Sequence, residues 1–416
     1  MTITPPAERH DPYASLRLRN FRLYIISLWA LTIATQIQAV VVGWQVYSVT
    51  NDPLSLGLVG LAEALPFIAV ALYAGHVADR RARRPVALIS TAGMLLCALA
   101  LLIFTLRPGF MMRHGVWPIY VVIFASGIAR SFARPASTAL SAELVTRDLY
   151  SNSIAWRSST WQFAAVVGPA LGGLLYGFAG ATSAYAVDVA LMGVSAIALA
   201  LIGHNAVPSG GDPVPIGESL RLGLRFVFGQ PVILGAMTLD LFSVLFGGAV
   251  ALLPIFASDI LHAGPQGLGV LRAAPAVGSV VMGLYLAHRP PLPRAGRTLF
   301  ICVAIFGLSM IAFGLSRSLL LSFAILTISG LADNVSVVLR STLVQTMTPE
   351  HLLGRVAAVN QIFIGSSNEI GAFESGVAAK LMGTVPSVVF GGAMTLIVVA
   401  LTAWRSKALR ELDTIG

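Results

Sequence analysis

The chain has 416 residues, of which 56% are hydrophobic and only 11% are charged, and its formal net charge is +9. Soluble domains carry roughly 25% charged residues, so this composition excludes an ordinary soluble enzyme or binding domain. The basic residues lie in short loops rather than on one folded face, which argues against nucleic acid as a partner. Cys97 and Cys302 both fall within apolar runs and predict neither a disulfide nor a metal site.

Apolar runs recur from Phe21 to Trp404, each close to the ~20 residues with which a helix crosses a bilayer. Only helices and closed barrels satisfy their backbone hydrogen bonds in lipid, and barrel strands alternate over ~10 residues. The runs therefore predict an all-α membrane protein with twelve spans. Their approximate ranges are 21–49, 53–77, 85–106, 116–142, 152–178, 182–203, 232–257, 267–288, 298–314, 318–345, 355–379 and 384–404.

Basic residues are distributed unequally over the loops that join these spans. Assigning the loops alternately to two sides places 18 Arg or Lys with both termini, four on the opposite side and five inside spans. Positive residues stay in the cytoplasm during insertion, so both termini are predicted to be cytoplasmic, in a bacterial inner membrane. The first 20 residues are polar and the run that follows is too long for a cleavable signal, so we expect this run to anchor the chain.

An internal repeat divides the chain. Residues 145–155 (VTRDLYSNSIA) align without gaps with residues 347–357 (MTPEHLLGRVA), and each segment joins the fourth and fifth span of a set of six. This pattern predicts two parallel six-helix repeats with the substrate site at their interface near the midplane. The predicted units are an N-terminal bundle over 1–203, a cytoplasmic linker with an amphipathic helix over 204–231 and a C-terminal bundle over 232–416.

The loop after the second span reads GHVADRRARR over residues 75–84. It resembles the signature motif of the major facilitator superfamily, Gly-x-x-x-Asp-Arg-x-Gly-Arg-Arg, with alanine in place of the second glycine. The resemblance implies that Gly75 and Asp79 dock on helix 11 in the outward-facing state and that Arg83 pairs with Glu143. The alternative is a basic loop that only fixes topology. The residues of this predicted gate are Gly75, Asp79, Arg80, Arg83, Arg84 and Glu143.

The fifth predicted span contains Gly168-Pro169-Ala-Leu-Gly172-Gly173. This sequence resembles the Gly-Pro-x-x-Gly-Gly part of the antiporter motif of proton-coupled exporters in the same superfamily. Proline bends a helix because it removes a backbone hydrogen bond, and glycines allow close approach of a partner helix, expected to be the eighth span. The resemblance implies export in exchange for protons, and plain helix packing is the alternative.

Further stretches narrow the resemblance to one subgroup of the superfamily. They are residues 20–22 at the start of the first span, Arg134-Pro135 followed by 143–145, and residues 219–227 before the seventh span. Together they are similar to the subgroup that contains the enterobactin exporter and related siderophore and drug exporters. The resemblance implies transport of a small organic molecule by alternating access, by a monomer and without a cofactor.

Charged residues inside the spans are the candidates for function, because each costs ~2.5–3.5 kcal/mol at a helix centre on insertion scales. The resemblance implies a cavity lined by helices 1, 4, 7 and 10, which favours Asp240, Asp333 and Arg130. A structural ion pair is the alternative for each, and it is the favoured interpretation of Asp188. The candidate proton- and substrate-binding residues are Asp240, Asp333, Arg130, Arg340, Glu63, Glu369, Glu374 and Gln38.

Other polar residues in the spans carry weaker predictions. Arg134 and Arg157 lie near the cytoplasmic ends of their helices, where long basic side chains extend toward the interface. Thr35, Gln38 and Gln45 share one face of the first span, and either substrate binding or hydrogen bonds between helices explains them.

A proton-coupled exporter is the function that these patterns favour, and a proton-coupled importer of a small solute is the alternative. The sequence contains no His-x-x-x-His pair, no Gly-x-Ser-x-Gly and no phosphate-binding Gly-x-x-x-x-Gly-Lys loop, so an enzyme is not expected. A sensor is not expected either, because no soluble domain accompanies the spans.

Overall fold

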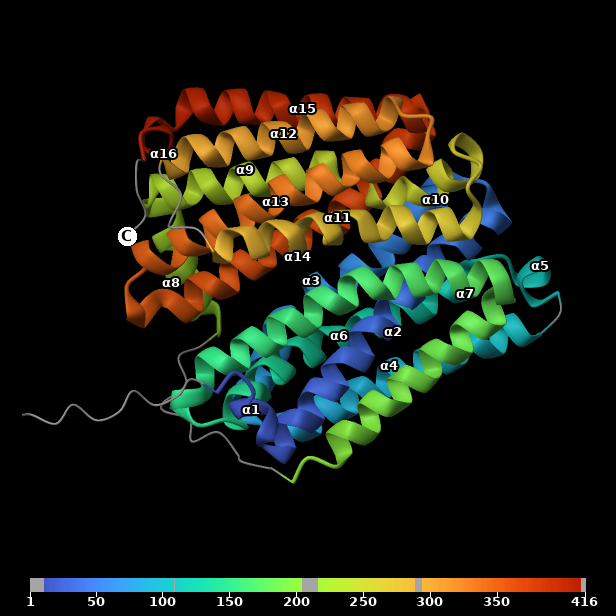
Figure 1. The fold of residues 1–416 in the computed structure, drawn as a ribbon, viewed down its shortest axis with the longest axis horizontal. Coiled ribbons are helices and arrows are strands. Elements are labelled where there is room, and N and C mark those ends of the chain that lie inside the picture. Colours follow the sequence, from blue (N-terminus) through green and yellow to red (C-terminus); the bar gives the residue numbers. More distant parts are fainter. Residues whose placement is uncertain (1–10, 108, 204–215, 289–293, 413–416) are drawn as a thin grey trace, which may run out of the picture.

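A computed structural model describes residues 11–107, 109–203, 216–288 and 294–412. Within these ranges the chain forms helices joined by short turns (Figure 1), as the apolar runs predict. Nine helical stretches of the described chain are long and apolar enough to cross a membrane. Two more long helices, α6 (Trp117–Glu143) and α14 (Glu350–Met382), overlap the fourth and eleventh predicted spans.

The helices of the N-terminal half pack together in one group, coloured blue to green in Figure 1. Besides α6, this group comprises α1 (Ala14–Arg17), α2 (Arg19–Thr50), α3 (Pro53–Arg80), α4 (Arg83–Leu106), α5 (Phe110–His114), the short turn η1 (Arg147–Leu149) and α7 (Tyr150–Ala200). α2 packs along α7, while α3 and α4 both pack on α6. Buried aliphatic side chains such as Ile37, Val41 and Ile119 fill these contacts.

The C-terminal helices form a second group, coloured yellow to red. Besides α14, it comprises α8 (Ile216–Gly229), α9 (Pro231–Gly247), η2 (Ala249–Leu252), α10 (Leu253–Ile255), η3 (Phe256–Ile260), α11 (Gly264–Ala287), α12 (Ala295–Leu315), α13 (Leu319–Met347), α15 (Thr384–Arg405) and α16 (Lys407–Arg410). Within this group α13 packs against α11 and α12, and α9 packs on α14 and α15. The two groups meet where α3 contacts α14 and α7 contacts α11.

One span deviates from the prediction. The fifth and sixth spans lie within α7 as two helices separated at Gly180, where φ is 78° and ψ is 173°, as predicted. The seventh span, predicted as one helix over 232–257, is broken after α9 because Gly248 has a non-helical ψ of 69°. The chain then continues through η2, α10 and the π-helical η3. Pro254 has no N–H to donate, which adds to the irregular geometry.

The ends of the described chain lie on one side of the molecule. α1 and α16 are both at the left of Figure 1, as an even number of crossings requires. α8, at the same end, is the amphipathic helix that the linker sequence predicts: Val227 is buried, while Arg221 and Arg225 are exposed. α8 packs on α14 and thereby ties this surface helix to the second group. We refer to this side as the terminus end.

Candidate functional site

A cavity of about 1680 Å³ lies between the two helix groups. Its walls come mainly from α2, α3, α6 and α7 on one side, and from α9, α11 and α14 on the other. At the terminus end it reaches Arg80 and Gly354, which are exposed, whereas at the opposite end it stops at Gly43 and Leu56, which are buried. The cavity therefore opens at the terminus end.

The helices that form the wall differ from those expected. Helices 1, 4 and 7 contribute as the resemblance implies, but among the described residues α13, the tenth span, contributes none. α3 and α14, the second and eleventh spans, take its place. The reason is packing: α3 and α14 meet each other across the interface, whereas α13 packs mainly against α11 and α12. Apolar periodicity does not fix this rotation, because membrane helices are apolar on both their protein and lipid faces.

Asp240 and Asp333, the favoured candidates, do not line the central cavity. They border a separate pocket of about 10 Å³ between α9, α12 and α13. Arg340 forms an ion pair with Asp240, and the two side chains are only 4% and 10% exposed. The expectation that these acids face the substrate path is therefore wrong, although they do lie together as a cluster of charges.

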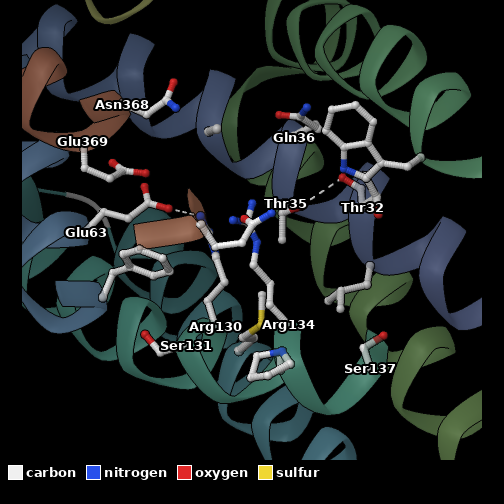
Figure 2. Close-up of a pocket in the computed structure, with 18 of the residues that line it drawn as sticks. Thr32, Thr35, Gln36, Glu63, Arg130, Ser131, Arg134, Ser137, Asn368 and Glu369 are labelled. Carbon is white, nitrogen blue, oxygen red and sulfur yellow. Dashed lines mark hydrogen bonds and ion pairs between the residues drawn. The ribbon is translucent and has the colours of Figure 1, made fainter. Parts of the chain in front are cut away.

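Arg130 is the predicted residue that the structure places at the heart of the cavity. From α6 it forms an ion pair with Glu63 of α3. Glu369 of α14 interacts electrostatically with Arg130, Arg134 and Arg272. Figure 2 shows that both glutamates approach the arginines from the same side of the cavity. Positive and negative side chains from both helix groups thus meet within one solvent-accessible space.

Three further arginines of the wall were not assigned to the site from the sequence. Arg134 and Arg157, expected to extend to the interface, line the cavity instead, and so does Arg272 of α11. Arg272 donates a hydrogen bond to the carbonyl of Ala39 on α2, at 3.1 Å. The sequence spacing could have indicated this position for Arg134. It lies four residues from Arg130, and residues four apart on a helix share one face.

The remaining candidates separate into wall and packing residues. Gln38 is on the wall and buried, and its Nε2 has no hydrogen-bond partner among the described residues. Gln45, predicted to share its face, accepts a hydrogen bond from Tyr185 at 2.8 Å and serves helix packing. Glu374 lies off the described wall, five residues beyond Glu369 on α14.

Asp188 differs from every other charged residue in the spans. It is fully buried in α7, and neither carboxyl oxygen has a hydrogen-bond partner in the described chain. The structural ion pair favoured for it is therefore wrong: Arg130 acts on it electrostatically, without an ion pair. An unpaired carboxylate is very costly in such surroundings.

The signature loop adopts part of the predicted arrangement. Arg83 Nη1 lies 2.6 Å from Glu143 Oε1, so the pairing implied by the resemblance is present. Arg84 donates hydrogen bonds to the last carbonyls of α7. A Cβ added at Gly75 would meet nothing within 4 Å, so this glycine does not touch helix 11 in the conformation observed. The side chain of Asp79 lies outside the described residues.

The antiporter-like glycines face two different helices. Gly173 packs on α11, the eighth span, where an added Cβ would lie 2.7 Å from the Cα of Gly269. Gly168 and Gly172 pack on α2 instead, which corrects the expected partner for those two. Because α7 runs between α2 and α11, small residues on its different sides serve both contacts. Pro169 lies inside α7 and its carbonyl faces Gly269.

Contacts between the two helix groups close the end opposite the termini. Tyr47 of α2 donates a hydrogen bond to the carboxylate of Asp259 in η3. Lys380 of α14 pairs with Asp52, which precedes α3, at 2.9 Å. These polar bridges, with the close approach of α7 to α11, give the molecule one closed and one open end.

A family of known proteins shares this sequence over almost its whole length. The sequence profile of transmembrane secretion effectors matches residues 10–415. The chain belongs to this family of the major facilitator superfamily. It is therefore a membrane transporter and not an enzyme.

Relatives of the chain include enterobactin exporters of several enterobacteria. The enterobactin exporter EntS of Shigella flexneri is 26% identical over 392 residues, which cover 94% of this chain and 90% of the relative. The enterobactin exporters of Escherichia coli O1:K1 and of Citrobacter koseri match to the same extent. Enterobactin exporters are thus similar to this chain along nearly its full length.

Solved structures of other transporters share the fold. A POT family transporter in complex with a thioalcohol-conjugated peptide has a TM-score of 0.74 at 11% identity, covering 93% of this chain and 96% of its own. The nucleoside transporter NupG has a TM-score of 0.73 at 13% identity, with coverages of 94% and 100%. At these identities the likeness establishes the major facilitator fold and nothing about the substrate.

Proposed function

We propose that this protein exports a small organic molecule across the bacterial inner membrane, by alternating access and in exchange for protons. The observation that carries the proposal is the cavity between the two helix groups, which is open at one end and closed at the other. With both termini in the cytoplasm, as the basic loops predict, the open end is the loading side of an exporter. One chain encloses the cavity, so a monomer suffices.

Alternating access requires the two ends to open and close in turn. We take residues 1–203 and 232–416 as the moving bundles and 204–231 as their linker. At the open end, added Cβ atoms at Gly75 and Gly354 would meet nothing within 4 Å, which leaves room for these segments to approach. Docking of Gly75 and Asp79 on helix 11 then belongs to the opposite state, in which the contacts at the other end are released.

Proton coupling is proposed for the closed cluster of Asp240, Asp333 and Arg340. An antiporter needs a group that holds a proton in one conformation and releases it in the other. Asp240 lies one turn before Val244, which lines the cavity on the same helix. Movement of α9 during the transport cycle would therefore alter the ion pair with Arg340. Asp240 then binds a proton when the pair is broken and releases it when the pair forms.

The proposal is tested in inverted membrane vesicles with enterobactin, the substrate named for the relatives. We expect accumulation inside the vesicles that depends on an imposed pH gradient. Asp240→Asn or Asp333→Asn should abolish gradient-driven accumulation but keep exchange of labelled for unlabelled substrate, with the exposed Asp148→Asn as the control. Wild-type pumping by both variants would exclude this cluster as the coupling site and leave Glu63, Glu369 and Glu374 to be tested.

Alternation itself is tested at the contact of α7 with α11. Gly173→Leu should prevent closure of the end opposite the termini, because its side chain would collide with the α11 backbone. We expect a folded, inactive protein in which a cysteine introduced at that end reacts with an impermeant thiol reagent. Gly193→Leu, on the helix that follows the break at Gly180, is the matched control, since a Cβ there meets nothing within 4 Å. Normal transport by the Gly173 variant would argue against closure at this contact.

A further inference from the structure

We propose that the central cavity selects organic anions, and that Arg130, Arg134 and Arg157 bind the anionic group. The inference rests on the proposed transport function and names the chemical class of its substrate. A carboxylate, sulfonate or phosphate on an aromatic or otherwise apolar body fits the description.

The charges on the wall carry the argument. Six arginines and two glutamates line the described cavity, which leaves an excess of four positive charges. Charges interact more strongly within a protein than in bulk water, and a cleft lined by one sign of charge concentrates ligands of the opposite sign. An organic anion is stabilised by this excess, a neutral molecule gains nothing from it, and a cation is repelled.

The arginines are also arranged to hold an anion. Arg130 and Arg134 are four residues apart on α6, and Figure 2 shows their guanidinium groups next to each other. Arg134 is exposed to the cavity and forms no ion pair with any described residue. Arg157, from α7, has a buried Nε without a hydrogen-bond partner in the described chain. Neighbouring guanidinium forks bind carboxylate, sulfonate or phosphate oxygens through paired hydrogen bonds.

The rest of the wall suits the body of such a molecule. Trp161 lines the cavity with 51% of its surface exposed, and Phe67 and Leu31 add apolar area. Ligand sites combine apolar walls of this kind with a few polar groups that fix orientation. Hydroxyl and amide side chains from α2 and α14, including Thr35 and Asn368, supply neutral hydrogen bonds around it.

The two glutamates allow a test of whether the cavity binds anions or cations. In this ligand-free arrangement Glu63 pairs with Arg130, and Glu369 acts on Arg130 and Arg134. A bound anion has to compete with these carboxylates for the arginines. Removal of Glu369 should therefore strengthen anion binding, while removal of Arg134 should weaken it. A site for cations predicts the reverse for both variants.

The experiment measures the binding of three fluorescent probes to the full-length protein in lipid nanodiscs, with protein-free nanodiscs subtracted. The probes share a pyrene ring and carry a sulfonate, a neutral sulfonamide or a trimethylammonium group. We expect the wild type to prefer the sulfonate. Arg134→Gln should weaken sulfonate binding about tenfold, the value of one lost charge-assisted hydrogen bond, and Glu369→Gln should strengthen it. Arg147→Gln and Asp148→Asn, exposed on η1 outside the cavity, are the matched controls.

The outcomes separate this inference from the proposed function. Equal binding of the three probes, preference for the trimethylammonium probe, or the opposite response of the two variants would overturn anion selectivity. Pumping of the trimethylammonium compound in preference to the matching sulfonate in vesicles would also overturn it, while leaving export intact. If the sulfonate is preferred and both variants respond as expected, but the vesicles pump nothing, anion selectivity stands and the export proposal fails.

Discussion

Two ion pairs inside the helical body have the same chemistry and opposite surroundings. Arg130 and Glu63 join α6 to α3 at the cavity wall, and their side chains are 27% and 24% exposed. Arg340 and Asp240 join α13 to α9 within the C-terminal group and are 4% and 10% exposed. The first pair lines the central cavity, whereas packed side chains surround the second.

This difference in access assigns different roles to similar residues. A charge that can exchange its partner for a ligand is suited to binding, because the ligand replaces the interaction that is lost. A charge sealed among packed helices has only its protein partner, and separating the two exposes each to an apolar environment. The surroundings of the first pair suit the substrate recognition proposed for the cavity, and those of the second suit the proton coupling proposed for its cluster.

The largest effect is expected when the sealed pair is broken. Arg340→Gln leaves the Asp240 carboxylate buried without compensation, which costs about 3–5 kcal/mol of stability. Arg130→Gln should cost only about 1 kcal/mol, because Glu63 remains in contact with the solvent of the cavity. Thermal unfolding of the two purified variants, measured side by side in one detergent, gives the comparison directly.

A double variant is the control for this prediction. Asp240→Asn combined with Arg340→Gln removes both charges and should recover part of the lost stability, since residues in direct contact are non-additive. Equal destabilisation by Arg130→Gln and Arg340→Gln would contradict the distinction between an accessible and a sealed pair.

The features of the sequence that predict the fold can be read without knowing how the helices pack. Apolar runs predict the helices, and the signature loop predicts the pairing of Arg83 with Glu143. Rotation of each helix about its axis is harder to predict, because lipid-facing and protein-facing sides are both apolar. For this reason Asp333 was expected on the cavity wall and Arg134 at the membrane interface. Instead, Arg134 lines the cavity and Asp333 borders the small separate pocket. The break at Gly248 also depends on tertiary packing that the sequence does not show.

An intermediate effect is expected for the third pair, Arg83 and Glu143, at the terminus end. Their side chains are 22% and 15% exposed, between the other two pairs. Arg83→Ala should slow transport several-fold, because a partly exposed ion pair contributes about 1 kcal/mol to the state in which it forms. Glu143→Ala should have a similar effect, and the double variant should be no slower than either single one. Additive losses of transport rate would show that the two residues act separately.

The smallest effect is expected at Asp188, the buried acid without an ion pair. If its carboxyl group is neutral, Asp188→Asn replaces one uncharged planar group by another of the same shape and should change stability by less than about 1 kcal/mol. Arg340→Gln is the matched comparison, and it should destabilise strongly because it leaves the Asp240 carboxylate buried without its countercharge. Infrared difference spectra of the two proteins add a direct readout: the carbonyl band of a protonated carboxylic acid should disappear in Asp188→Asn. Strong destabilisation by this variant, with no loss of that band, would mean that Asp188 carries a charge in the folded protein.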